Sequence, residues 1–200
     1  MIKCTTVVAG VGVISLVLVG CSEGSDGVAT PIPGESESVS QNSSGISGLP
    51  HSGAPAVDNP LPEAVLSDHP CEVLTPQQLR EVLGEGTSEG ERVDREELGP
   101  GCDWFNRETF GGFQLVFDTV SRQGLSAAYM NAKPQSSIFQ EIDPVLGFPA
   151  VVYKDGENDP RCTAVVGLGD EYSIAVTVSQ SAEKKAAGTD SCVPAEQVAE

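Results

Sequence analysis

Residues 162–179 read Cys-Thr-Ala-Val-Val-Gly-Leu-Gly-Asp-Glu-Tyr-Ser-Ile-Ala-Val-Thr-Val-Ser. In the second half, Tyr172, Ile174, Val176 and Val178 alternate with small or polar residues, which is the period of a strand with one buried face. An apolar run precedes it, and Gly169-Asp170 lies between the two as a turn signal. The stretch predicts an antiparallel hairpin with strands at 162–168 and 171–179.

Further strands are expected on the N-terminal side of this hairpin. Residues 102–106 and 113–120 form a second candidate hairpin around Gly111-Gly112, and Phe113, Leu115 and Phe117 share one face of its second strand. Residues 137–142 and 149–154 are two further strand candidates. We expect an antiparallel sheet of about five strands.

Helices are predicted at both ends of this region. Thr75-Pro76-Gln77-Gln78 combines an N-cap, an early proline and a capping-box glutamine, and Gly84 ends that helix. Residues 124–132 have helical spacing, and another helix begins near Cys192. Residues 85–101 are expected to form an acidic, glycine-rich loop. The fold class is therefore α+β, with helices packed on the sheet over residues 68–200.

Four cysteines lie in this domain, at Cys71, Cys102, Cys162 and Cys192. In an oxidising compartment, an even number of cysteines predicts two disulfides, for which three pairings are formally possible. We favour Cys71 with Cys102 and Cys162 with Cys192, because the two spacings are nearly equal and place one loop in each half. A zinc site would need closely spaced ligand pairs, so we predict no metal.

The N-terminus has the features of a secretion signal. A short cationic start at Met1 to Lys3 precedes an apolar run from Thr5 to Val19, which is too short to span a bilayer comfortably. The run ends in Leu18-Val19-Gly20-Cys21, which resembles a bacterial lipobox. The resemblance implies that residues 1–20 are a lipoprotein signal peptide and that Cys21 carries diacylglycerol and further acyl chains such as palmitate. We expect the protein on the outer face of the plasma membrane.

Residues 21–67 are rich in Ser, Gly, Pro and Asn and contain no Lys or Arg. Such a composition buries too little apolar surface to offset the entropy of ordering. We predict a disordered tether that links the lipid to the domain.

The composition excludes several functions. The 200 residues hold 11 Lys+Arg against 29 Asp+Glu, a net charge of −18 that opposes binding to nucleic acid. No HExxH, GxSxG or P-loop motif occurs, and the two histidines are His51 and His69. We predict no catalytic residue and no cofactor. The expected function is non-enzymatic binding, and the alternative is an envelope hydrolase whose carboxylate pair the sequence does not identify.

Several short motifs resemble one family. They are His-Pro-Cys-Glu-Val-Leu-Thr at 69–75, Gly-Cys-Asp-Trp at 101–104, Leu-Gly-x-Pro-Ala at 146–150, and the late cysteines. In this order they resemble the actinobacterial lipoproteins catalogued as domain of unknown function 3558. The resemblance implies a secreted lipoprotein of the cell envelope with two cysteine pairs and no assigned catalytic residue.

The expected partners are the membrane, through the N-terminal lipid, and either an envelope protein or a small amphiphile. An amphiphile needs a cavity, which we expect between the sheet and the helices. Its predicted lining is Phe113, Leu115, Phe117, Ile174 and Val176. We expect a monomer.

Overall fold

The structure is a computed structural model, and it describes residues 48–200. The predicted signal peptide, the lipidation site at Cys21 and the tether up to residue 47 lie outside the described residues. In the described part, every helix is too short or too polar to cross a membrane.

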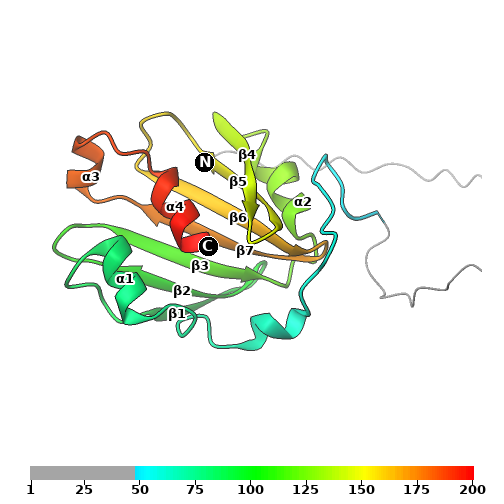
Figure 1. The fold of residues 1–200 in the computed structure, drawn as a ribbon, viewed down its shortest axis with the longest axis horizontal. Coiled ribbons are helices and arrows are strands. Elements are labelled where there is room, and N and C mark those ends of the chain that lie inside the picture. Colours follow the sequence, from blue (N-terminus) through cyan, green and yellow to red (C-terminus); the bar gives the residue numbers. More distant parts are fainter. Residues whose placement is uncertain (1–47) are drawn as a thin grey trace, which may run out of the picture. The chain divides into compact units, whose positions relative to one another are not determined.

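Seven antiparallel strands form one sheet, so the expected number of about five is too low. Their order across the sheet is β1-β2-β3-β7-β6-β5-β4, with the predicted hairpin β6–β7 near the centre (Figure 1). The bounds are β1 Glu91–Arg95, β2 Gly99–Phe105, β3 Gly112–Asp118, β4 Ile138–Val145, β5 Phe148–Lys154, β6 Arg161–Gly169 and β7 Tyr172–Ser179.

The central hairpin turns one residue later than predicted. Gly169 pairs with Tyr172, so Asp170 and Glu171 form the turn, and the register shifts between Gly167 and Gly169. A Cβ at Gly169 would lie 2.5 Å from the Tyr172 ring, so a larger residue in this bulge would displace that ring. The alternation of apolar residues predicted both strands correctly, but it did not indicate the extra residue in β6.

Strand β1 lies within residues 85–101, for which a loop was predicted; that prediction is wrong for this part. The strand has no buried apolar face, so its sequence lacks the usual alternation. It is held by pairing with β2 and by an ion pair of 2.8 Å between Arg95 Nη2 and Asp103 Oδ1. An edge strand of this kind depends on its neighbour rather than on its own pattern.

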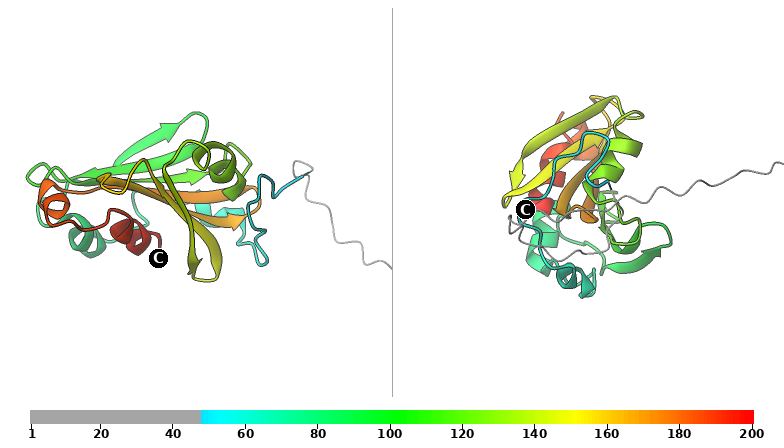
Figure 2. Two further views of the ribbon diagram at one scale, coloured as in Figure 1. Left: turned by 90° about the horizontal axis from the view of Figure 1, so that it is seen from above. Right: turned by 90° about the vertical axis from the view of Figure 1, so that its right-hand side faces the viewer.

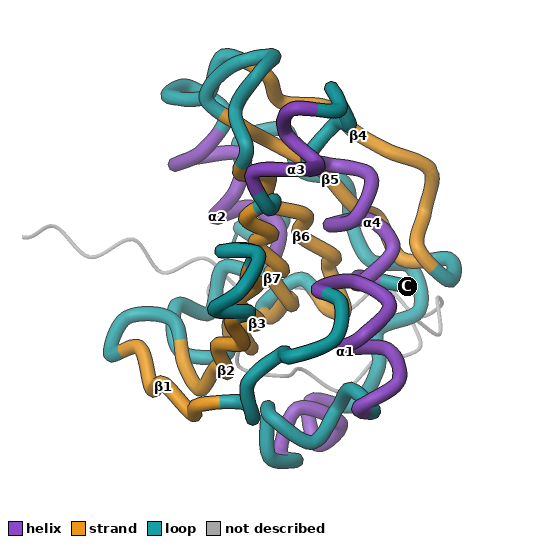
Figure 3. Tube along the Cα trace, turned by 90° about the vertical axis from the view of Figure 1, so that its left-hand side faces the viewer, coloured by secondary structure: helices purple, strands orange, loops and turns teal. Residues whose placement is uncertain are grey.

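The helices occupy both faces of the sheet. They are α1 Pro76–Leu83, α2 Leu125–Ala127 followed by a π-helical turn η2 Ala128–Ala132, α3 Ala182–Ala186 and α4 Cys192–Ala199. The predicted capping box of α1 is present, with Thr75 and Gln78 bonded reciprocally. Figures 2 and 3 show α1 and α4 on one face and α2 on the other.

The prediction of disorder up to residue 67 is wrong for residues 48–67, which pack against the sheet. The Val57 N–H donates to Asp170 Oδ1 (3.0 Å), and the Leu61 N–H donates to the Leu168 carbonyl (2.9 Å). A 3-10 helix, η1 Glu63–Ser67, follows and buries Leu66. A few apolar side chains thus order a segment whose average composition is typical of a linker.

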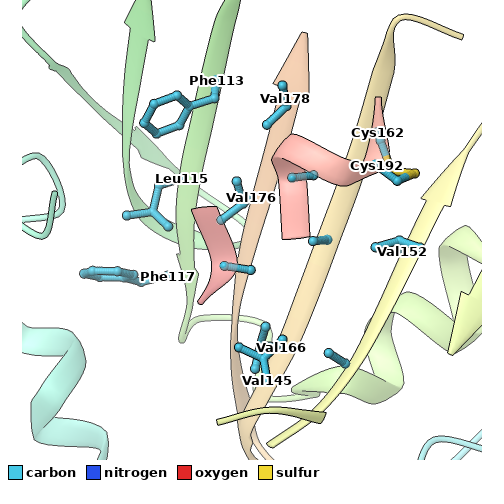
Figure 4. Close-up of a cluster of buried hydrophobic side chains, with 14 of the residues drawn as sticks. Phe113, Leu115, Phe117, Val145, Val152, Cys162, Val166, Val176, Val178 and Cys192 are labelled. Atoms are coloured by element: carbon cyan, nitrogen blue, oxygen red, sulfur yellow. A yellow bond between two sulfur atoms is a disulfide. The ribbon is translucent and has the colours of Figure 1, made fainter. Parts of the chain in front are cut away.

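Both favoured disulfides are present, Cys71–Cys102 and Cys162–Cys192. The first joins the segment before α1 to β2, and the second joins β6 to the first residue of α4. Figure 4 shows the Cys162–Cys192 bridge beside the buried cluster that contains Phe113, Val166 and Val176. A smaller cluster around Leu125, Tyr129 and Val151 lies on the opposite face.

A buried lysine, Lys154, stabilises the N-terminal end of α4 through Asp190. Lys154 Nζ donates to Asp190 Oδ1 at 2.8 Å and to the Glu157 carbonyl at 3.2 Å, and its side chain is only 3% exposed. Asp190 Oδ1 also accepts the Cys192 N–H at 2.9 Å. The Asp190 side chain, in contrast, is 54% exposed. Replacing Asp190 therefore leaves a buried charge unpaired, whereas replacing Lys154 leaves a charge that water can solvate.

We expect Asp190→Ala to lower the free energy of unfolding by about 2 kcal/mol at neutral pH, because the Lys154 ammonium stays buried without its counter-charge. Lys154→Met should cost less, because the freed Asp190 carboxylate is open to water. Denaturant unfolding of the two variants and the wild type measures both values.

The same pair predicts a pH dependence. The hydrogen bond from Lys154, followed by that from the Cys192 N–H, lowers the pKa of Asp190 below 3.8. A lowered folded pKa contributes stability that is complete above the unfolded pKa and is lost as the pH falls through the folded pKa. The difference between wild type and Asp190→Ala should therefore be constant above about pH 5 and shrink between about pH 5 and about pH 2. A difference that stays constant down to about pH 2 would contradict this assignment.

Candidate functional site

An open groove lies between the sheet and the helices that cover one of its faces. Its volume is about 790 Å³. The floor comes from β3, β6 and β7, and the walls come from η1, the segment before α1, α1 itself and the end of α4. The lining residues are Val65, Leu66, Val73, Leu74, Gln78, Glu81, Val82, Leu115, Phe117, Leu168, Ile174, Gln197, Val198, Ala199 and Glu200.

Strand alternation explains the floor. Leu115 and Phe117 on β3 point to the same face, and Figure 4 shows both side chains on the side of β3 away from β7. Ile174 pairs with Phe117 across β3 and β7, and Leu168 extends the floor onto β6. Four apolar side chains from three strands therefore border the groove; Leu115, Phe117 and Leu168 are 4%, 3% and 8% exposed, and Ile174 is half-buried.

Three of the five residues predicted for a cavity line this groove: Leu115, Phe117 and Ile174. The prediction is wrong for Phe113 and Val176, each of which is 1% exposed in the closed core. Phe113 stacks on Trp104 with ring centroids 4.6 Å apart. Val176 belongs to the same buried cluster as Ala195 of α4, which covers this part of the sheet.

The walls include residues that the sequence did not indicate. Val65 and Leu66 come from the segment predicted to be disordered, and Val73 and Leu74 come from the segment leading into α1. For Val65 and Leu66, the apolar run Ala64-Val65-Leu66 could have indicated that this segment packs against the domain. Val65 and Val73 are each 43% exposed, so the mouth of the groove presents aliphatic side chains to solvent.

A second hollow of about 710 Å³ adjoins the C-terminal end of α4. It is lined by Ile142, Asp143, Pro144, Val145, Leu146, Glu196 and Glu200. Glu200 borders both hollows, and Leu146, at the β4–β5 turn, is 80% exposed.

The charges around the two hollows have one sign. Among residues 48–200, no lysine or arginine lines either of them, whereas Glu81, Asp143, Glu196 and Glu200 do. Burial, followed by the charges of Asp190 and Glu200, raises the pKa of Glu196. The groove thus combines an apolar floor with an acidic end.

Another pocket, between α1 and α3, is less suited to an apolar ligand. Its volume is about 340 Å³, and its lining includes Arg80, Gln180 and Lys184. Lys184 Nζ donates to the Val82 carbonyl at 3.0 Å, which ties α3 to α1. This contact has a structural role.

The side chains of the two histidines each contact a residue close in the sequence. His51 Nδ1 contacts the hydroxyl of Ser52 at 3.1 Å, and His69 Nδ1 accepts the Cys71 N–H at 3.3 Å. Burial raises the pKa of Asp118, which lies on the face of β3 opposite the groove floor. Within the part of the chain that the structure describes, no group of three or more His, Cys, Asp or Glu residues could hold a metal ion.

The fold and the groove define a class of protein: a disulfide-linked α+β domain whose single antiparallel sheet carries an open apolar groove beneath its helices. The chain belongs to the family described as "Protein of unknown function (DUF3558)", whose sequence model matches residues 16–200. This confirms the family that the sequence motifs resemble. Neither the curated proteins nor the solved structures contain a match to the chain.

Proposed function

We propose that this protein is a lipid-anchored lipoprotein of the cell envelope that binds a small amphiphile in the groove and carries out no catalysis. The lipobox-like sequence ending at Cys21 supports the anchor and the extracytoplasmic location. The disulfides Cys71–Cys102 and Cys162–Cys192 fit an oxidising compartment.

The apolar groove is the observation that carries the binding proposal. A volume of about 790 Å³ lies within the range of small-molecule sites, which combine apolar walls with a few polar groups. Its floor is rigid because Leu115, Phe117 and Ile174 project from paired central strands. The valines at its mouth expose apolar surface that an acyl or alkyl chain would cover.

The proposal predicts that a double change at the mouth weakens binding. Val65→Ser/Val73→Ser should reduce the affinity for dodecyl maltoside about fivefold, since each valine loses part of its apolar contact. The measurement is isothermal titration calorimetry below the micelle concentration. The protein is a full-length Cys21→Ser chain, which keeps residues 48–200 intact and removes the predicted acylation site.

Val120→Ser/Val193→Ser is the matched control, because these valines are 53% and 50% exposed and do not line the groove. Its affinity should equal that of the unmodified chain within about twofold. Absence of dodecyl maltoside binding, or equal weakening by both double variants, would overturn the proposal. Binding of a protein partner would then become the leading explanation.

A further inference from the structure

The groove and the second hollow meet at the end of α4. Glu200 borders both, and Glu196 lies one helical turn earlier on the same helix. Across the second hollow lie Asp143, near the end of β4, and the exposed Leu146 of the β4–β5 turn. Figure 2 shows the end of α4 next to this turn. Three of the four acidic residues that line the two hollows, Asp143, Glu196 and Glu200, therefore lie around the end of α4, and the fourth, Glu81, lies on α1.

We propose that the ligand is a cationic amphiphile, whose apolar chain lies on Leu115, Phe117 and Ile174 and whose positively charged head lies among Glu196, Glu200 and Asp143. This inference rests on the proposed function, because it assigns the chemistry of the ligand in the same groove. The head is an amine or quaternary ammonium group that needs no partner beyond these carboxylates.

Electrostatics distinguishes this ligand from the other amphiphiles. An anionic head would meet several carboxylates and, within residues 48–200, no lining lysine or arginine. Opposite charges a few ångströms apart attract more strongly where the groups are partly withdrawn from water. Glu196 is half-buried, whereas Asp143 and Glu200 are exposed.

The surroundings of Glu196 support the same assignment. Burial, and next the charges of Asp190 and Glu200, raises the pKa of Glu196, so its ionised form is disfavoured in the free protein. A cation placed here would relieve that cost. A neutral head would leave it unchanged, and an anionic head would increase it.

The test compares three amphiphiles with the same alkyl chain: dodecyltrimethylammonium, dodecyl maltoside and dodecyl sulfate. Each is titrated by calorimetry into the full-length Cys21→Ser chain below its micelle concentration, at low salt. The cationic compound should bind about tenfold more tightly than the neutral one, and dodecyl sulfate should bind most weakly. The cationic preference should diminish as salt is added.

A net charge of −18 attracts any cation, so the location must be tested separately. Glu196→Gln/Glu200→Gln should weaken dodecyltrimethylammonium binding about tenfold and leave dodecyl maltoside binding unchanged within about twofold. Glu96→Gln/Glu97→Gln makes the same change of net charge at exposed positions in the β1–β2 turn, and it should leave both affinities unchanged.

The outcomes separate the two proposals. Equal affinities for the three compounds, or equal weakening by the two glutamine variants, overturn the cationic ligand while the amphiphile groove stands. If none of the three compounds binds, the proposed function fails as well. Tighter binding of dodecyl sulfate than of the ammonium compound overturns the inference directly.

Discussion

Replacing Phe113 with alanine is expected to lower the free energy of unfolding by about 4 kcal/mol. Phe113 is 1% exposed and stacks on Trp104. Trp104 lies on β2, as does Cys102 of the Cys71–Cys102 disulfide. Removal of the ring leaves a cavity between paired central strands, whose backbone cannot collapse to fill it. Chemical denaturation of the disulfide-intact protein measures the effect.

Phe110→Ala is the matched control for this prediction. Phe110 is 71% exposed and contacts Phe105 edge-on, so its removal should cost less than about 1 kcal/mol. Equal losses for Phe110→Ala and Phe113→Ala would show that Phe113 lies outside the core, contrary to the structure.

Removing the Cys162–Cys192 disulfide with Cys162→Ala/Cys192→Ala should lower the free energy of unfolding by about 3.5 kcal/mol. The loop that it closes spans 30 residues, and loop-closure entropy gives a contribution of about that size. Because the bridge fixes the first residue of α4 to β6, we also expect faster amide exchange along α4. Denaturant unfolding and hydrogen exchange measure the two effects.

The Cys71–Cys102 disulfide provides the comparison. Its loop spans 31 residues, so its removal should cost a similar amount through loop entropy, but it should leave amide exchange in α4 unchanged. A loss below about 1 kcal/mol for either double variant would contradict the contribution assigned to these bridges.

The local elements of this fold could be predicted because short-range chemistry specifies them. The alternation of Tyr172, Ile174, Val176 and Val178 identified β7, and the capping box at Thr75 identified the start of α1. The near-equal cysteine spacings favoured the pairing that the structure contains. These signals extend over a few residues or depend only on loop length.

Other elements depend on neighbours that are distant in the sequence. Strand β1 has no buried apolar face, and it forms because β2 offers a partner edge. Residues 48–67 have the composition of a linker, yet Val57 and Leu61 bond to the β6–β7 region more than 100 residues later. No local sequence pattern indicates contacts between residues so far apart in the chain.

The sequence alone predicted the strands with one buried face, the first helix and the lipobox-like motif at Cys21, and it favoured one of three possible cysteine pairings. Which of the three residues on this face of β3 border the groove depends on the tertiary structure: Leu115 and Phe117 do, and Phe113 does not. The three alternate identically on one strand face, so the pattern cannot distinguish them. The difference arises from what covers each position: Trp104 stacks on Phe113, whereas Leu115 and Phe117, which are 4% and 3% exposed, border the groove between η1, α1 and the end of α4.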